Sequence, residues 1–195
     1  MAAVKRIKES AMESKEQIRK RILEKRNALT PAQRMRSEIL VTERILGHQW
    51  YYKAGEILLF ASFGSEISTK DIIEDAFAGG KKVYLPKVEG EDMHFYQVLP
   101  GESLIKGYGG ILEPSGDKER MFVYEESKME TVLMLMPGAA FDPTRNRIGY
   151  GKGFYDRYLA DKRSLHTIAI GFDCQMTAEI ESCETDIKPM QVICL

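Results

Sequence analysis

A run of glycines between basic residues, at positions 145–157 (RNRIGYGKGFYDR), has the clearest chemical character in this chain. Gly149, Gly151 and Gly153 stand at every second position, and an amphipathic segment follows them. Glycine adopts positive φ and lets a ligand approach the backbone closely, while the first amides of a following helix have no internal partners. Such amides bind phosphate oxygens. The spacing therefore predicts a phosphate cradle.

Charged side chains accompany these glycines: Arg145, Arg147, Lys152 and Asp156. A hydrogen bond to a charged group contributes about 1.5 to 3 kcal/mol, so the three basic residues would favour a phosphate. Asp156 would repel a bare phosphate unless a cation lay between them. Magnesium is the ordinary cation in such sites, so the pattern predicts Mg²⁺ beside Asp156.

Two common phosphate motifs do not match this segment. The P-loop requires Ser or Thr after its Gly-Lys pair, but Gly153 follows Lys152, and Asn146 occupies the place of the earlier glycine. The dinucleotide fingerprint G-x-G-x-x-G has a different spacing from G-x-G-x-G. Glycines alone also fit a mobile loop that caps a helix, so that interpretation stays open at this point.

The segment resembles the most specific motif of the 5-formyltetrahydrofolate cyclo-ligase family, also called methenyltetrahydrofolate synthetases. The similar residues are Pro137-Gly138-x-x-Phe141-Asp142 and then Arg147-x-Gly149-x-Gly151-x-Gly153-Phe154-Tyr155-Asp156. The resemblance extends over most of the chain, to Lys15 through Arg19, Glu66, Gly110-Ile111-x-Glu113-Pro114 and Asp186. The chain departs from the family pattern at Lys152, Phe154 and Thr185, where Gly, Tyr and His are common.

The resemblance implies an ATP-dependent enzyme that cyclises 5-formyltetrahydrofolate to 5,10-methenyltetrahydrofolate and releases ADP and phosphate. A phosphorylated formyl group is the implied intermediate, and ATP and Mg²⁺ are the implied cofactors. The substrate would be a small folate, with no nucleic acid or membrane as partner. Another ATP-dependent phosphotransferase or ligase with the same cradle is an alternative. An RNA-binding protein that uses a basic N-terminal arm is a further one.

The resemblance also implies roles for particular residues. The catalytic residues would be Arg147 and Tyr155. ATP would be bound by Lys15, Arg19, Arg147, Gly149, Gly151, Lys152, Gly153, Phe154 and Tyr155. The folate would contact Ala61, Glu66 and Tyr150, and the metal would be held by Asp156 and Asp186.

The surrounding sequence alternates between helical and strand patterns. A capping box at Ser14 predicts one helix that carries Ile18 and Ile22. Thr30 as a cap, with Pro31 in the first turn, predicts a second helix that runs towards Tyr52. Further expected elements are strands at 55–63, 82–88, 93–98, 132–136 and 167–172, a helix at 69–78, and a helix after Gly153. This alternation predicts a three-layer α/β/α fold with a largely parallel central sheet. The ligand of such a sheet lies beyond the carboxyl ends of its strands.

Composition adds few constraints. The 195 residues suffice for one domain with a substantial core, and no apolar run approaches the ~20 residues that span a membrane. The first residues lack the apolar core of a secretory signal, so a cytoplasmic location is expected. The three cysteines and three histidines show no metal-ligand spacing.

Positive charge is concentrated near the N-terminus. Residues 1–36 hold eleven Lys or Arg against four Glu. A solvated helical face explains such a pattern, and a nucleic-acid-binding arm is the functional alternative. The resemblance instead assigns Lys15 and Arg19 to the phosphates of ATP.

Overall fold

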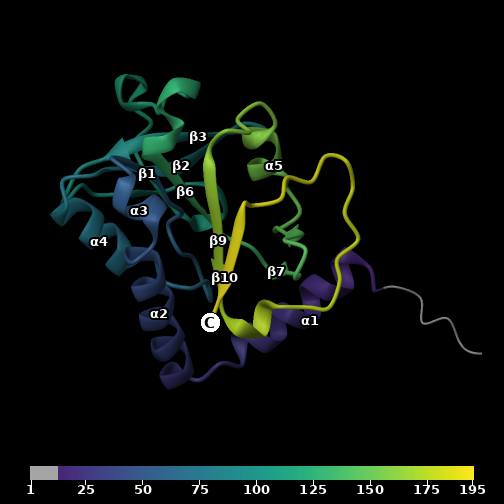
Figure 1. The fold of residues 1–195 in the computed structure, drawn as a ribbon. Helices are drawn as coiled ribbons and strands as arrows, with labels where there is room; N and C mark the ends of the chain where they lie inside the picture. Colours follow the sequence, from purple (N-terminus) through teal and green to yellow (C-terminus); the bar gives the residue numbers. More distant parts are fainter. Residues whose placement is uncertain (1–12) are drawn as a thin grey trace, which may run out of the picture.

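The computed structural model describes residues 13–195, which form a six-stranded sheet with helices on both faces (Figure 1). The strand order is β10-β9-β6-β1-β2-β3. Every pair of neighbours is parallel except β2 and β3, which form an antiparallel hairpin. The strands are β1 (Glu56–Leu58), β2 (Lys82–Glu89), β3 (Asp92–Val98), β6 (Val132–Met136), β9 (His166–Gly171) and β10 (Gln191–Cys194). The expected fold class is confirmed.

Alternate residues of the central strand β6 point to opposite faces of the sheet, as the pleat requires. Leu133 and Leu135 pack with α2 (Pro31–Leu46), α3 (Gln49–Lys53) and α4 (Lys70–Ala78). Met134 and Met136 pack on the other side, with α5 (Phe154–Leu159) and Phe122. All of β6 is buried, which is typical of a parallel strand covered on both faces.

Helix α1 (Lys15–Asn27) packs beside the main sheet and not on it. Its Ile18 and Ile22 contact Ala139, Ala140 and Ile148, which belong to the small hairpin of β7 (Ala140–Phe141) and β8 (Arg147–Ile148). The glycine loop begins directly after β8. The basic helix therefore lies against the hairpin that leads into the glycine loop (Figure 1).

Three sequence expectations about element boundaries were wrong. The second helix does not continue to Tyr52, because it ends at Leu46 with Gly47 as its C-cap. The first strand ends at Leu58 and not at residue 63. Ser62 lies in the loop that follows, where its hydroxyl donates to the carbonyl of Ile67. The β9 strand ends at Gly171.

Other elements agree with the sequence patterns, and some have no counterpart in them. The Ser14 capping box of α1 and the Thr30 cap of α2 are confirmed, as are α4, the β2–β3 hairpin and β6. The unexpected elements are β10, the β7–β8 hairpin and the pair β4 (Ile105–Lys106) and β5 (Leu112–Glu113).

Among residues 13–195, none of the helices has the length and apolar character needed to cross a membrane.

Candidate functional site

A cavity of about 500 Å³ opens beyond the carboxyl ends of β1 and β6, where the fold predicts a ligand site. This volume is in the usual range for small-molecule sites. Its lining includes most of the expected site residues: Ala61, Glu66, Arg147, Gly149, Tyr150, Lys152, Gly153, Phe154, Tyr155 and Asp156. The remaining expected residues, Lys15, Arg19, Gly151 and Asp186, lie beside the cavity in the contacts described below.

The glycine loop needs its glycines for two different physical reasons. Gly151 has φ 90° and Gly153 has φ 65°, a left-handed region that favours glycine. Gly149 instead leaves space, because a Cβ there would lie 3.0 Å from a guanidinium nitrogen of Arg147. Helix α5 begins after Gly153 and has only six residues. Arg145, which also flanks the loop, donates to the carbonyl of Met190.

Arg147 and Asp156 form an ion pair across this loop. Nη2 of Arg147 donates to Oδ1 of Asp156 at 3.0 Å. The Arg147 guanidinium also lies 5.5 Å from the ring centre of Tyr155. Oδ1 of Asp156 accepts a second bond, from the amide of Ile187 at 3.1 Å. The loop is thereby tied to the segment that carries Asp186.

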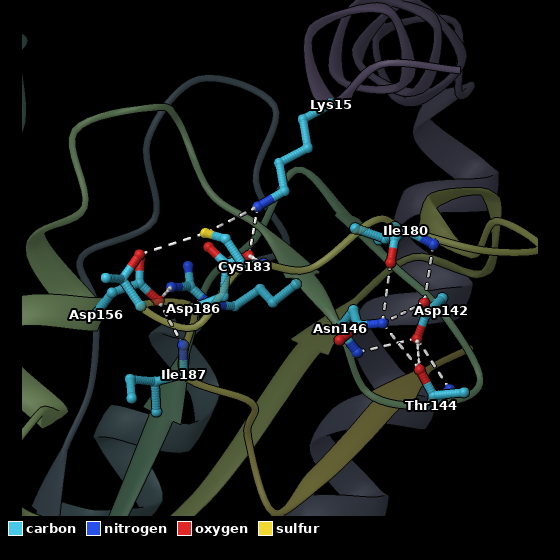
Figure 2. Close-up of polar contacts among 11 residues, drawn as sticks. Lys15, Asp142, Thr144, Asn146, Asp156, Ile180, Cys183, Asp186 and Ile187 are labelled. Carbon is cyan, nitrogen blue, oxygen red and sulfur yellow. Dashed lines mark hydrogen bonds and ion pairs between the residues drawn. The ribbon is translucent and has the colours of Figure 1, made fainter. Parts of the chain in front are cut away.

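The second carboxylate, Asp186, is held by Lys15 of α1 and by the amide of Cys183 (Figure 2). Burial raises the pKa of Asp186, but these hydrogen bonds outweigh it and leave the pKa below its ordinary value. Burial lowers the pKa of Lys15, and the bond to Asp186 and the charge of Asp156 more than reverse this. The negative charges of both Asp156 and Asp186 therefore act on Lys15.

The two carboxylates could serve as metal ligands only together with oxygens from elsewhere. Within the described residues 13–195, no group of three or more His, Cys, Asp or Glu side chains is arranged to hold a metal ion. Mg²⁺ commonly takes one or two carboxylates and fills its remaining positions with phosphate oxygens and water. Asp156 and Asp186 fit that donor set.

Arg19 connects α1 to the glycine loop. Its Nε donates to the carbonyl of Gly149 at 2.9 Å, and its guanidinium lies beside Gly151. Lys15 and Arg19, four residues apart, therefore both project from α1 towards the glycine loop and the C-terminal segment. Their role at the phosphates of ATP stays a prediction.

A buried carboxylate, Asp142, fixes the turn between β7 and β8. It is 1% exposed and accepts bonds from the amides of Thr144, Asn146 and Ile180, each at 2.9 Å (Figure 2). Burial raises the pKa of Asp142, yet the hydrogen bonds prevail and the pKa is lowered. The residue thus holds the hairpin and the C-terminal segment in one arrangement.

Glu66 follows β1 and lines the cavity together with Tyr150. The amide of Phe63 donates to Glu66 Oε2 at 2.9 Å. Burial raises the pKa of Glu66, and hydrogen bonding from Tyr150 and the charge of Arg26 only partly oppose this. Burial and the nearby Glu66 charge raise the pKa of Tyr150. The wall presents a carboxylate acceptor beside an aromatic ring.

Tyr155 places a buried hydroxyl at the cavity without a protein partner. Within the described residues, neither its hydroxyl nor Nε of Arg147 has a hydrogen-bond partner. Burial raises the pKa of Tyr155 strongly, so the hydroxyl stays protonated and can donate. Buried polar groups without partners are uncommon, and a bound ligand is one explanation for such a pair.

Arg26 is a cavity residue that sequence reasoning missed. Its side chain is buried at 4% exposure and lines the cavity. It follows Ile18 and Ile22 at four-residue spacing, so it continues the apolar stripe of α1. The sequence did contain a signal for a buried arginine, because Arg26 occupies the position where the apolar stripe would place its next hydrophobic residue.

Comparisons with known proteins find relatives over most of the chain. A family model described as the 5-formyltetrahydrofolate cyclo-ligase family matches residues 11–195 of the chain. The 5-formyltetrahydrofolate cyclo-ligase of Mus musculus is 29% identical over 192 residues, which cover 92% of this chain and 93% of that protein. The 5-formyltetrahydrofolate cyclo-ligase of Haemophilus influenzae is 30% identical, with 93% of this chain and 97% of that protein covered.

A solved structure has a similar fold. The NMR structure of Aquifex aeolicus 5,10-methenyltetrahydrofolate synthetase superposes with a TM-score of 0.78 and 26% sequence identity. The superposition covers 92% of this chain and 89% of that chain.

Proposed function

The chain belongs to the 5-formyltetrahydrofolate cyclo-ligase family, and from this premise we propose that it cyclises 5-formyltetrahydrofolate to 5,10-methenyltetrahydrofolate. The reaction would consume ATP and release ADP and phosphate. The observation that carries the proposal is the cavity of about 500 Å³, which brings Glu66, Tyr150 and Tyr155 together with the Arg147–Asp156 pair.

The chemistry requires activation of a poor electrophile. A formyl group on nitrogen resembles an amide, so its oxygen is a poor leaving group. The formyl oxygen would take the γ-phosphoryl group of ATP, with cleavage of the bond to ADP. The neighbouring folate nitrogen would then attack the formyl carbon and lose its proton to solvent, and the C–O bond would break to release phosphate. Positioning and charge neutralisation carry most of the catalysis in such phosphoryl transfers.

Arg147 and Tyr155 are the proposed catalytic residues. The buried guanidinium of Arg147 would stabilise negative charge on the transferred phosphoryl group, because a preorganised donor in a water-poor site acts strongly. The unpartnered hydroxyl of Tyr155 would donate to the substrate. Both groups lie on one side of the cavity, next to each other.

The ATP phosphates would contact the glycine loop and α1. Backbone amides of the loop and the side chains of Lys15 and Arg19 supply donors and positive charge there. The proposed ATP contacts are Lys15, Arg19, Arg147, Gly149, Gly151, Lys152, Gly153, Phe154 and Tyr155. Asp156 and Asp186 would hold Mg²⁺, which would neutralise phosphate charge.

The folate would occupy the cavity wall formed by Ala61, Glu66 and Tyr150. The Glu66 carboxylate would accept hydrogen bonds from N–H groups on the edge of the pterin ring, and Tyr150 would contact its face. Ala61, half-buried after β1, leaves space for the ring.

The RNA-binding alternative loses its main support. Basic side chains of α1 contact other parts of the chain: Lys15 contacts Asp186, Arg19 contacts Gly149 and Arg26 contacts Tyr150. These side chains do not form a solvated stripe for a nucleic-acid backbone. A different ATP-dependent phosphotransferase or ligase remains the competing proposal.

Ultraviolet-monitored turnover tests the proposal. Purified protein with 5-formyltetrahydrofolate, ATP and Mg²⁺ is expected to form methenyltetrahydrofolate together with one ADP for each product molecule. Omission of either substrate is the control and should abolish both signals. Absence of methenyltetrahydrofolate under these conditions would reject the proposal.

A further inference from the structure

Arg26 places a guanidinium inside the protein, at the cavity shared with Glu66 and Tyr150. Its side chain comes from the last turn of α1 and is 4% exposed. Burying a charged group is costly unless it is paired and hydrogen-bonded. Its polar contacts should therefore account for its position.

The guanidinium joins two segments that flank Glu66. Nε of Arg26 donates to Oγ of Ser65 at 3.0 Å, and Nη1 donates to the hydroxyl of Tyr150 at 2.8 Å. The guanidinium carbon also lies 5.8 Å from the centre of the Tyr150 ring. Ser65 directly precedes Glu66, while Tyr150 belongs to the glycine loop. Arg26 thus connects the segment before Glu66 to the glycine loop.

The chemistry of arginine fixes the direction of these bonds. A guanidinium only donates, so the Tyr150 oxygen must accept from Arg26. The hydroxyl proton of Tyr150 is then free to point elsewhere, and a hydrogen bond from Tyr150 is among the causes that lower the pKa of Glu66. Tyr150 and Glu66 both line the cavity, so the bond from Arg26 leaves the Tyr150 hydroxyl proton available to the Glu66 carboxylate or to a ligand beside it.

We propose that Arg26 is a positioning residue for folate binding: it orients Tyr150, and through Tyr150 the Glu66 carboxylate, without touching ATP. The inference rests on the proposed function, because it assigns the folate to the wall of Glu66 and Tyr150. Arg26 would thus increase the affinity for folate, whereas Lys15 and Arg19 on the same helix would bind ATP.

A second arginine shows that Arg26 is not needed merely to hold the loop. Arg34 of α2 donates to the carbonyl of Ser65 at 2.9 Å, and it also donates to the carbonyl of Arg26. Its guanidinium packs over Phe172 at 5.3 Å. The backbone before Glu66 is therefore held independently, which leaves the bond to Tyr150 as the distinctive contribution of Arg26.

A double-mutant cycle tests the inference. Arg26→Met, Tyr150→Phe and the double variant are titrated with 5-formyltetrahydrofolate in the absence of ATP, and the Michaelis constant for ATP and the melting temperature are measured separately. Each single variant is expected to weaken folate binding about tenfold, since one hydrogen bond to a charged group is lost. The double variant should be only slightly weaker than the singles, because both remove the same link.

Two further variants keep the test decisive. Arg26→Lys retains the charge but lacks the planar fork, so it should also weaken folate binding while ATP kinetics stay normal. Arg21→Met alters another arginine of α1, one that pairs with Glu13, and should bind folate within about twofold of wild type.

The outcomes separate this inference from the proposed function. Wild-type folate affinity in both Arg26 variants would overturn the inference and leave the proposed function intact. Equal losses in folate binding, ATP kinetics and thermal stability would assign Arg26 a purely structural role and would also overturn it. Failure of the wild-type protein to bind 5-formyltetrahydrofolate would overturn both.

Discussion

Arg147 and Asp156 face each other across the glycine loop at 3.0 Å, with the arginine side chain only 4% exposed and the carboxylate 25% exposed. The pair closes the loop whose backbone is proposed to bind phosphate. It also means that Asp156 has two roles, as a partner of Arg147 and as a proposed metal ligand. A substitution at this position should therefore affect both catalysis and stability.

Asp156→Asn is expected to lower turnover by about 100-fold or more while 5-formyltetrahydrofolate affinity changes little. The amide keeps the shape of the side chain but removes the charge that would hold Mg²⁺. Loss of the ion pair should also lower the free energy of unfolding by about 1 to 2 kcal/mol. Turnover at saturating Mg²⁺, folate titration and chemical denaturation measure the three effects.

Asp161→Asn is the matched control for that variant, because Asp161 lies just past α5 with its side chain 79% exposed. It should leave turnover unchanged. Normal turnover of Asp156→Asn at saturating Mg²⁺ would contradict the metal assignment.

Removal of divalent cations should abolish methenyltetrahydrofolate formation. The ATP phosphates would otherwise meet the uncompensated negative charge of Asp156 and Asp186. Activity is measured after dialysis against a chelator and again after Mg²⁺ is restored, while folate binding without ATP serves as the control and should persist. Full activity in the chelator would reject the requirement for a metal.

Arg19→Ala should raise the Michaelis constant for ATP about tenfold, because one charged hydrogen-bond donor near the phosphates is lost. Within residues 13–195 its side chain makes one hydrogen bond, to the Gly149 carbonyl, so the melting temperature should fall by only a few degrees. Lys20→Ala, at an exposed position of the same helix, is the control. Unaltered ATP kinetics in Arg19→Ala would contradict the assignment of Arg19 to the ATP phosphates.

Glu66→Gln should stabilise the protein at neutral pH while it weakens folate binding. Burial raises the pKa of Glu66, so the folded state binds its proton more tightly than the unfolded state does. Stability is therefore lost as the pH rises through the interval between the unfolded pKa and the raised folded pKa. The neutral amide avoids that loss.

Melting temperatures of wild type and Glu66→Gln across pH 4 to 8 check this prediction. The melting temperature of Glu66→Gln should exceed that of wild type near neutral pH. The excess should shrink at acid pH, where wild-type Glu66 is protonated and therefore also neutral. Glu74→Gln, on the exposed side of α4, should show no such trend. A difference independent of pH would mean that the charge of Glu66 is not the cause.

The sequence predicted those parts of the fold that depend on local patterns. The capping box at Ser14, the apolar run of β6 and the β2–β3 hairpin each have a signal within a few residues. The β7–β8 hairpin could not be predicted, because its strands are two residues long and show no periodicity. The end of the second helix was missed because the Gly47 cap interrupts a continuous helical pattern.

Some residues of the candidate site also have a local sequence signal, and others have none. The glycine loop was predictable because its positive φ angles require particular residues at fixed spacing. Glu66 and Asp186 had no distinctive local signal and were named only through the family resemblance. Arg26 was missed because its partners, Ser65 and Tyr150, are 39 and 124 residues away in sequence. A buried charge depends on tertiary partners, which no local pattern encodes.

The contacts of α1 also have a consequence for the order of folding. Lys15 meets Asp186 across 171 residues of sequence, and Arg19 meets Gly149 across 130. Contacts between residues so distant in sequence tend to form slowly, although the entropic cost of closing a loop grows only gradually with its length. The sheet can therefore assemble before the helix docks, and refolding followed by circular dichroism should run ahead of refolding followed by recovered activity.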